Sequence, residues 1–172
     1  MTKQPASNPA ASQPTARQVP VRQVSARQVS ARQVSGCIGF RLRKLSRRVS
    51  QIYDQMLAPL ELTGTQFSLM SNLVTHPDLS IGELADRLMM DPTTLTRTLR
   101  PLERRKLVAV AASREDRRRR GVVLTASGQA LFREAVPLWR KAQARIAELI
   151  GERGFDSLDK SLDLSLAQLA HA

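Results

Sequence analysis

The chain has 172 residues and a formal net charge of +12, and it is long enough for one domain with a hydrophobic core. No apolar run approaches the roughly 18 residues of a membrane span, and the N-terminus lacks the apolar stretch of a secretory signal. The one cysteine, Cys37, cannot form an intramolecular disulfide, so we expect a cytoplasmic protein with no membrane partner.

The excess positive charge lies in two windows of the chain. Residues 1–35 carry five bases and no acid, and residues 87–120 carry eleven bases and four acids, a net charge of +7. Bases and acids balance in the rest of the chain. A basic patch on an otherwise neutral body is typical of proteins that bind nucleic acid.

Residues 1–35 form a polar, basic tail in which the repeats ARQVP, VRQVS, ARQVS and ARQVS follow one another. A valine at every fifth position matches neither helical nor strand spacing, so we expect a disordered segment. The alternative is a tail that adds non-specific affinity for DNA phosphate.

Helical spacing begins near residue 36 and predicts a first helix that ends before Pro59. Two further helices begin with a hydroxyl side chain followed three residues later by Gln or Glu, the signature of a capping box. These pairs are Thr63 with Gln66 and Ser80 with Glu83. The apolar face of the first helix consists of Ile38, Leu42, Leu45, Val49, Ile52 and Met56.

A fourth helix is predicted to begin at Asp91 as its N-cap, with Pro92 at its first position. A short helix, a short turn and a capped second helix form the helix-turn-helix arrangement. Threonine and arginine, which contact phosphates and base edges, occupy one side of the second helix. That side presents Thr93, Arg97, Arg100 and Arg104, and the opposite side carries Leu95, Leu99 and Leu102.

Residues 107–112 and 121–125 show the alternation of two short strands, which places the arginine-rich stretch between them in the loop of a β-hairpin. Such a loop is a wing, and arginine suits a narrow, electronegative minor groove. Within it, Asp116 is expected to accept hydrogen bonds from Arg118 or from backbone N–H groups.

Thr125 is the predicted N-cap of a long helix bent at Pro137, and a break at GERG, residues 151–154, precedes a final helix. Leu164 lies off the apolar face of that final helix. The helix therefore carries more apolar surface than packing within one chain would cover. We predict that the first helix and the last two form a dimer interface.

The predicted fold class is mostly α with a small β-hairpin wing, a winged helix-turn-helix with a helical dimerisation region. The predicted parts are a disordered basic tail over residues 1–35, a dimerisation region over 36–62 and 126–172, and a DNA-binding lobe over 63–125.

Residues 36–170 resemble the MarR-type winged-helix transcription regulators. The resemblance rests on LTGTQF, on SIGELADRLMMDPTTLTRTLRPLERRKLV, and on DRRRRGVVLT followed by ASG. The family pattern of Asp-x-Arg, an alternating strand, Leu-Thr and a later glycine falls on Asp116, Arg118, Leu124, Thr125 and Gly128 without an insertion.

This resemblance implies a homodimer that places two recognition helices in successive major grooves of a pseudo-palindromic operator. Family members typically repress their own or a neighbouring gene, and many release DNA when a small aromatic or phenolic acid occupies a cleft beside the DNA-binding lobe. By the same resemblance, Arg118 enters the minor groove. Arg114 and Arg117, in the same arginine-rich stretch, are further candidate DNA-binding residues. The recognition helix presents Thr93, Thr94, Thr96, Arg97 and Arg100 to the DNA.

Two residues depart from the family pattern. Lys106 stands where a glycine often ends the recognition helix, and a left-handed backbone there costs about 1–2 kcal/mol. Pro101 lies inside that helix and removes the hydrogen bond to the Arg97 carbonyl, so we expect a bent helix in which the role of Arg104 is in doubt.

Three residues are candidates for sensing a signal. Cys37 is a candidate redox sensor, because some family branches sense peroxide through a cysteine in the first helix. It falls earlier than that sensor position, and Gly64 stands where a supporting tyrosine is expected, so a buried or inert thiol is the alternative. Tyr53 and Trp139, the only tyrosine and tryptophan, are candidates for a ligand cleft, or else core or interface residues.

No cofactor or metal site is expected, since His76 and His171 are the only histidines and neither pairs with the cysteine at ligand spacing. The sequence shows neither a phosphate-binding glycine loop nor a histidine placed to activate a nucleophile, so we do not expect an enzyme. The leading hypothesis is a sequence-specific transcriptional regulator of double-stranded DNA, a homodimeric repressor relieved by a small-molecule or oxidative signal. The alternative is an architectural DNA-binding protein without an effector, and an RNA-binding protein is disfavoured by the few aromatic residues.

Overall fold

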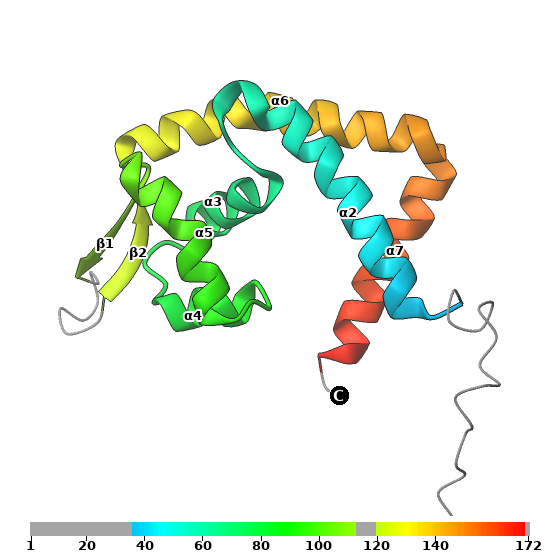
Figure 1. Ribbon diagram of the computed structural model, residues 1–172, viewed down its shortest axis with the longest axis horizontal. Coiled ribbons are helices and arrows are strands. Elements are labelled where there is room, and N and C mark those ends of the chain that lie inside the picture. The colour runs from blue at the N-terminus through cyan, green and yellow to red at the C-terminus, as the bar shows by residue number, and fades with distance from the viewer. Residues whose placement is uncertain (1–35, 113–119, 171–172) are drawn as a thin grey trace, which may run out of the picture. The chain divides into compact units, whose positions relative to one another are not determined.

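The computed structural model describes residues 36–112 and 120–170. The predicted tail over residues 1–35 and the wing residues 113–119 lie outside this part of the chain. The described ranges contain helices and a β-hairpin, which confirms the predicted fold class (Figure 1). In chain order the elements are α2 (Ile38–Leu57), the 3-10 helix η2 (Ala58–Leu60), α3 (Gly64–Thr75), α4 (Ile81–Arg87), α5 (Pro92–Arg104), β1 (Val108–Ala112), β2 (Arg120–Leu124), α6 (Ala126–Ile150) and α7 (Glu152–Leu169).

Both α3 and α4 begin with a capping box, as the sequence predicts. In each box a side chain and a backbone N–H group of two residues bond each other reciprocally. The backbone N–H of Gln66 donates to Thr63 Oγ1 at 3.2 Å, and the Thr63 N–H donates to Gln66 Oε1 at 3.0 Å. Ser80 and Glu83 make the same pair of bonds at 3.2 and 2.8 Å. Each box satisfies two N–H groups that have no partner within the helix, so both helix starts are encoded locally.

The long helix α6 is the frame on which α2, α3 and α7 pack. It contacts α2, α3, α7 and β2, and Figure 1 shows it running across the top of the view with α2 crossing it. The core lies mainly between α3, α4, α5 and the hairpin. Full burial of each large apolar side chain stabilises the fold by about 1.5–3 kcal/mol. The largest fully buried side chains are Leu57, Leu69, Met70, Leu84, Leu95, Leu99, Leu102 and Val122.

The hairpin is antiparallel and is anchored through β2 to the segment before α4. Val108 pairs with Leu124 and Ala111 with Gly121. The Val122 N–H also donates to the Leu79 carbonyl oxygen at 2.8 Å, forming an isolated bridge that sequence spacing did not predict. A Cβ at position 121 would lie 2.8 Å from the Asp78 carbonyl oxygen, so only glycine fits where the two segments meet.

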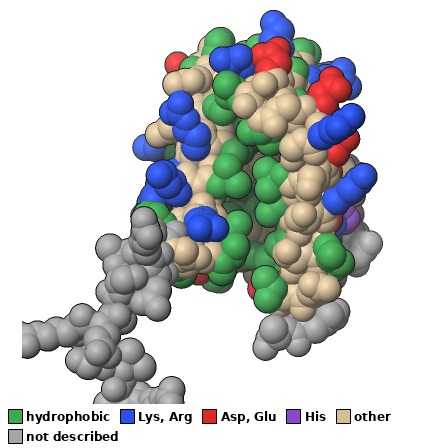
Figure 2. All heavy atoms as spheres, turned by 90° about the vertical axis from the view of Figure 1, so that its right-hand side faces the viewer, with side chains coloured by type: hydrophobic (Ala, Val, Ile, Leu, Met, Phe, Trp, Pro, Cys, Tyr) green, Lys and Arg blue, Asp and Glu red, His purple; other side chains and the backbone are tan. Residues whose placement is uncertain are grey.

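A large apolar face remains uncovered on α2, the end of α6 and α7. Figure 2 looks onto the side of the molecule that carries α2 and α7 and shows a furrow lined with hydrophobic side chains. A groove of about 360 Å³ there is lined by residues of α2, α6 and α7, among them Leu45, Ile146 and Leu162. The exposed large hydrophobic residues of α2, α6 and α7 are Ile38, Phe40, Leu42, Leu45, Leu149, Ile150, Leu162, Leu164, Leu166 and Leu169.

Two details differ from the sequence-based expectations. The first helix begins at Ile38, so Cys37 precedes it instead of opening it. The break before the final helix is confined to Gly151, which has a φ of 77°, and Glu152 is already helical.

Candidate nucleic-acid interface

A tight turn over residues 88–91 sets the geometry of α4 and α5. The Leu88 N–H donates to the Leu84 carbonyl oxygen at 3.1 Å, and the Met90 N–H donates to the Ala85 carbonyl oxygen at 2.9 Å. Between them Met89 takes a left-handed φ of 49°, which reverses the chain. The predicted helix-turn-helix is therefore present, with α5 as its second helix.

Asp91 caps α5 as predicted, and Pro92 follows at the first helical position. The Thr94 N–H donates to Asp91 Oδ1 at 2.9 Å. Hydrogen bonds from the side chain and the backbone of Thr94 lower the pKa of the Asp91 carboxyl, because they favour its charged form. The negative charge at the start of α5 also complements the positive end of the helix dipole.

The two sides of α5 separate as the helical spacing predicts. Leu95, Leu99 and Leu102 are at most 2% exposed and hold the helix against the core. On the other side Thr93, Arg97, Arg100 and Arg104 are exposed, and Thr94 and Thr96 are half-buried. The hydroxyl of Thr96 donates to the Pro92 carbonyl oxygen at 2.8 Å, which leaves its oxygen lone pairs to accept a bond from a partner.

The helix continues through Pro101 to Arg104 and then ends in a left-handed residue. Lys106 has a φ of 58°, as expected where the family often has glycine. Its carbonyl oxygen accepts hydrogen bonds from Thr125 Oγ1 at 2.7 Å and from Ser127 Oγ at 3.0 Å. The end of α5 is thereby tied to the start of α6.

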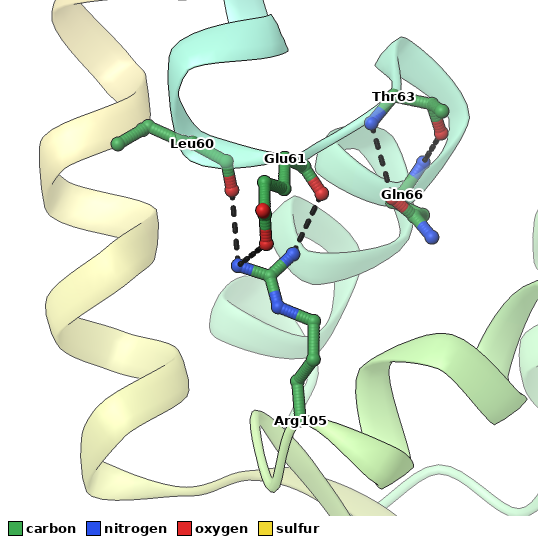
Figure 3. A network of polar contacts seen from close by, with 5 residues as sticks. All are labelled: Leu60, Glu61, Thr63, Gln66 and Arg105. Atoms are coloured by element: carbon green, nitrogen blue, oxygen red, sulfur yellow. Dashed lines mark hydrogen bonds and ion pairs between the residues drawn. The ribbon is translucent and has the colours of Figure 1, made fainter.

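Arg105, which sequence reasoning did not single out, connects the end of α5 to the linker between α2 and α3. Its guanidinium donates from Nη1 to the Glu61 carbonyl oxygen at 2.6 Å and from Nη2 to the Leu60 carbonyl oxygen at 3.0 Å (Figure 3). The same Nη2 lies 3.9 Å from Glu61 Oε2. The partners are backbone atoms far away in the sequence, so no local pattern could have indicated them.

The predicted wing residues Arg114, Arg117 and Arg118, with Asp116, lie outside the described part of the chain. The structure does describe the strands that lead to them. β1 follows α5 after Arg105, Lys106 and Leu107, and β2 leads directly into Thr125, whose Oγ1 accepts from the Gly128 N–H at 3.0 Å. The paired strands on either side of residues 113–119 therefore follow α5 closely in the chain.

Tyr53 and Trp139, the two candidates for a ligand cleft, line one cavity. Its volume is about 360 Å³, within the usual range for small-molecule sites. Trp139 and Phe67 stack with ring centroids 5.9 Å apart, and the Tyr53 hydroxyl hydrogen-bonds Gln143 Oε1. Burial raises the pKa of the Tyr53 phenol, and a hydrogen bond with the Trp139 side chain opposes part of that rise. The lining residues are Ser46, Val49, Ser50, Tyr53, Gly64, Thr65, Phe67, Ser68, Leu88, Met90 and Trp139.

Cys37 is exposed, so the expectation of a buried thiol is wrong, whereas an inert thiol and a redox role both stay predictions. Among the residues that the structure describes, no group of three or more His, Cys, Asp or Glu side chains lies close enough together to hold a metal ion. Nor does that part of the chain contain a helix with the length and apolar character needed to cross a membrane.

A capped helix-turn-helix, a β-hairpin directly after it and a frame of long helices define a winged-helix transcriptional regulator. A sequence profile of the MarR family matches residues 62–119. The M. tuberculosis transcriptional regulator MosR is 35% identical, with a TM-score of 0.66 over 78% of this chain and 96% of MosR. The chain belongs to the MarR family.

Two structures of the transcriptional repressor CouR are also similar. The complex of CouR with a 23-mer DNA duplex is 30% identical, with a TM-score of 0.67 over 80% of this chain and 95% of CouR. The complex of CouR with p-coumaroyl-CoA is 27% identical, with a TM-score of 0.69 over 79% of this chain and 96% of CouR.

Proposed function

We propose that the chain binds double-stranded DNA sequence-specifically and represses transcription as a cytoplasmic homodimer. The observation that carries the proposal is the divided surface of α5, in which Arg97 and Arg100 are exposed opposite a fully buried leucine face. Arginine reads guanine edges in the major groove and also neutralises phosphates. The DNA complex of MosR, 36% identical to this chain, supports this assignment.

In this proposal α5 lies in the major groove and the hairpin loop reaches the adjacent minor groove. Arg118 enters that groove, with Arg114 and Arg117 near the backbone. The base-reading surface of α5 consists of Thr93, Thr94, Thr96, Arg97 and Arg100.

A second copy of the same chain is the proposed occupant of the apolar face on α2 and α7. Leu164 and Leu166 are 60% and 51% exposed, and Ile38 and Leu169 are each 71% exposed, which is costly for a face of this extent in water. A two-fold axis through this face would pair two α5 helices, and a pseudo-palindromic operator mirrors that symmetry.

The cavity at Tyr53 and Trp139 is the proposed effector site. Its aromatic walls suit a flat aromatic ligand, and the Tyr53 side chain in its lining offers a hydroxyl to a polar group on that ligand. The CouR complex with p-coumaroyl-CoA supports a phenolic ligand class. Oxidation of the exposed Cys37 is the second proposed signal.

The test is a gel shift of the full chain on the DNA immediately upstream of its own gene, with random DNA as competitor. We expect a preference of roughly 10³-fold or more for the upstream DNA. The assay is repeated with peroxide and with Cys37→Ser, because a loss of binding that needs Cys37 would identify a thiol switch. Binding without preference over the competitor would favour an architectural DNA-binding protein instead. The role proposed is binding and not catalysis, as in the related regulators.

A further inference from the structure

The linker between α2 and α3 is a short, well-defined element to which Arg105 attaches the end of α5. Within it η2 contains Pro59, and Glu61 takes a left-handed φ of 51° with its N–H donating to the Ala58 carbonyl oxygen at 2.9 Å. Leu62 is only 3% exposed. The two carbonyl oxygens that Arg105 binds therefore occupy fixed positions, and Figure 3 shows the guanidinium between them.

The geometry of these contacts suits arginine specifically. Two nitrogens of one planar group reach two successive carbonyl oxygens, and a lysine ammonium would supply a single point of attachment. The Arg105 side chain is 32% exposed, so water and salt screen these charge-assisted bonds only in part.

The same linker joins two walls of the cavity at Tyr53 and Trp139. Tyr53 lies on α2 just before the linker, and Gly64 and Thr65 begin α3 just after it. A Cβ at position 64 would lie 2.9 Å from the Tyr53 Cβ, so the two walls touch at this point. At the other end of α5, Met90 also lines the cavity and directly precedes the Asp91 cap. Both ends of α5 are thus connected to the cavity wall.

The last turn of α5 depends on contacts from outside the helix. Pro101 has no N–H, so the Arg97 carbonyl oxygen lacks its usual donor within the helix. Arg97 and Arg100 lie in the turn of α5 that leads to Pro101. The direction of their side chains therefore depends on the direction of the helix axis in this turn. A contact that fixes the helix end therefore also fixes these two side chains.

We propose that Arg105 is a positioning residue through which the cavity sets the orientation of α5. Separation of the Tyr53 and Gly64 walls by a ligand moves the linker, and the guanidinium carries that movement to the end of α5. Because coupling between two sites is reciprocal, DNA bound at α5 changes the surroundings of Trp139. This inference rests on the proposed DNA-binding function and adds the route by which the site is regulated.

The experiment uses the full chain and the fluorescence of Trp139, the only tryptophan. Emission is measured with the DNA upstream of its own gene and with a scrambled duplex of equal length. For the wild type we expect a preference for the upstream DNA together with a shift in Trp139 emission. For Arg105→Ala we expect the emission shift to fall below half and the preference to fall at least fivefold. The exposed Arg140→Ala on α6 removes the same charge and should match the wild type.

Two further measurements keep the inference testable if Arg105→Ala folds poorly. Arg105→Lys retains the charge but not the paired donors, and should recover at most part of the emission shift and of the preference. In the protein alone, amide hydrogen exchange over residues 102–107 should accelerate at least fivefold in Arg105→Ala but not in Arg140→Ala.

The outcomes separate this inference from the proposed function. A wild type that prefers the upstream DNA without any change at Trp139 would overturn the inference, as would an Arg105→Ala variant that keeps the preference and the emission shift. A wild type that shows no preference at all would overturn the proposed function, and the inference with it.

Discussion

The backbone of Gly128 lies against the carbonyl group of Leu107, so that any side chain at position 128 would overlap the Leu107 oxygen. Gly128 is buried in the first turn of α6, and Leu107 joins α5 to β1. This contact allows the start of α6 to approach the end of the helix-turn-helix. The glycine that the family pattern expects at this position therefore has a steric reason.

We expect Gly128→Ala to destabilise the fold by about 1–3 kcal/mol, because the obstacle is backbone that cannot rotate away. Thermal unfolding should show a melting temperature several degrees below that of the wild type. The matched control is Gly82→Ala on α4, where a Cβ meets only Ser80 Oγ at 4.0 Å. That variant should gain about 0.5–1 kcal/mol from better helix propensity. Equal melting temperatures for Gly128→Ala and the wild type would show that the contact is not tight.

Arg97→Ala should reduce the preference for the operator over random DNA by about 5- to 100-fold, because a bidentate contact to a base edge is lost. Competition gel shifts at fixed salt measure this ratio. Arg140→Ala, an exposed arginine on α6, is the charge control and should leave the ratio unchanged. If binding to both DNAs weakens equally and the salt dependence falls by about one ion, Arg97 contacts only phosphate.

Tyr53 is the only tyrosine, so the phenolate absorbance of the native chain reports its titration alone. Because burial raises its pKa above the ordinary tyrosine value of 10.0, the folded state binds the phenolic proton more tightly than the unfolded state. The resulting stabilisation is complete below pH 10 and is lost as the pH rises through the folded-state pKa. Spectroscopic titration should give a midpoint above 10 in the native chain and a lower one in denaturant. Identical midpoints would contradict the burial of this group.

Asp91 should give the opposite pH dependence. Hydrogen bonds from Thr94 lower its pKa below the ordinary aspartate value of 3.8, so its contribution to stability is present above that pH and is lost as the pH falls through the folded-state pKa. Asp91→Asn keeps an N-cap oxygen but does not titrate. We expect denaturant unfolding of this variant to lose less stability between about pH 5 and 2 than the wild type loses. Parallel curves for the two proteins would remove Asp91 from the acid response.

Leu164→Glu should separate the proposed dimer. Leu164 is 60% exposed on α7, and a carboxylate in an apolar interface costs several kcal/mol in desolvation, so the dimer dissociation constant should rise by about 100-fold or more. Light scattering coupled to size exclusion measures the mass. Val74→Glu on α3, a residue 48% exposed and away from this face, is the control and should remain dimeric. A dimeric Leu164→Glu protein would place the interface elsewhere.

The parts of the fold that were predictable from the sequence are those determined by nearby residues. Thr63, Ser80 and Asp91 each bond a group three residues on, so their roles as helix caps could be predicted from spacing alone. The leucine face of α5 could also be predicted from the sequence, because helical periodicity places its leucines on one side of the helix. The left-handed Lys106 was expected only through the resemblance to the family.

The contacts that could not be predicted join residues far apart in the chain. Arg105 binds carbonyl oxygens of the α2–α3 linker, and Leu79 bridges to Val122; neither pairing has a signature in local sequence. Tyr53 and Trp139 were singled out by their rarity, but their shared cavity depends on how α2 and α6 cross. The exposure of Cys37 depends on where the first helix begins, and helix ends are the least certain feature of a sequence pattern.

The apolar face of α2 also has a consequence for the synthesis of the chain. Among the described helices, α2 with Ile38 to Leu45 leaves the ribosome before α6 and α7, which complete the same groove. Translation at about 5–20 residues per second takes roughly 5–20 seconds to cover the distance from Leu57 to Ile150. During that time the helix-turn-helix, with its locally encoded caps, can fold while the stripe on α2 has no partner. The nascent chain is therefore most exposed to aggregation and to chaperone binding at its earliest helix.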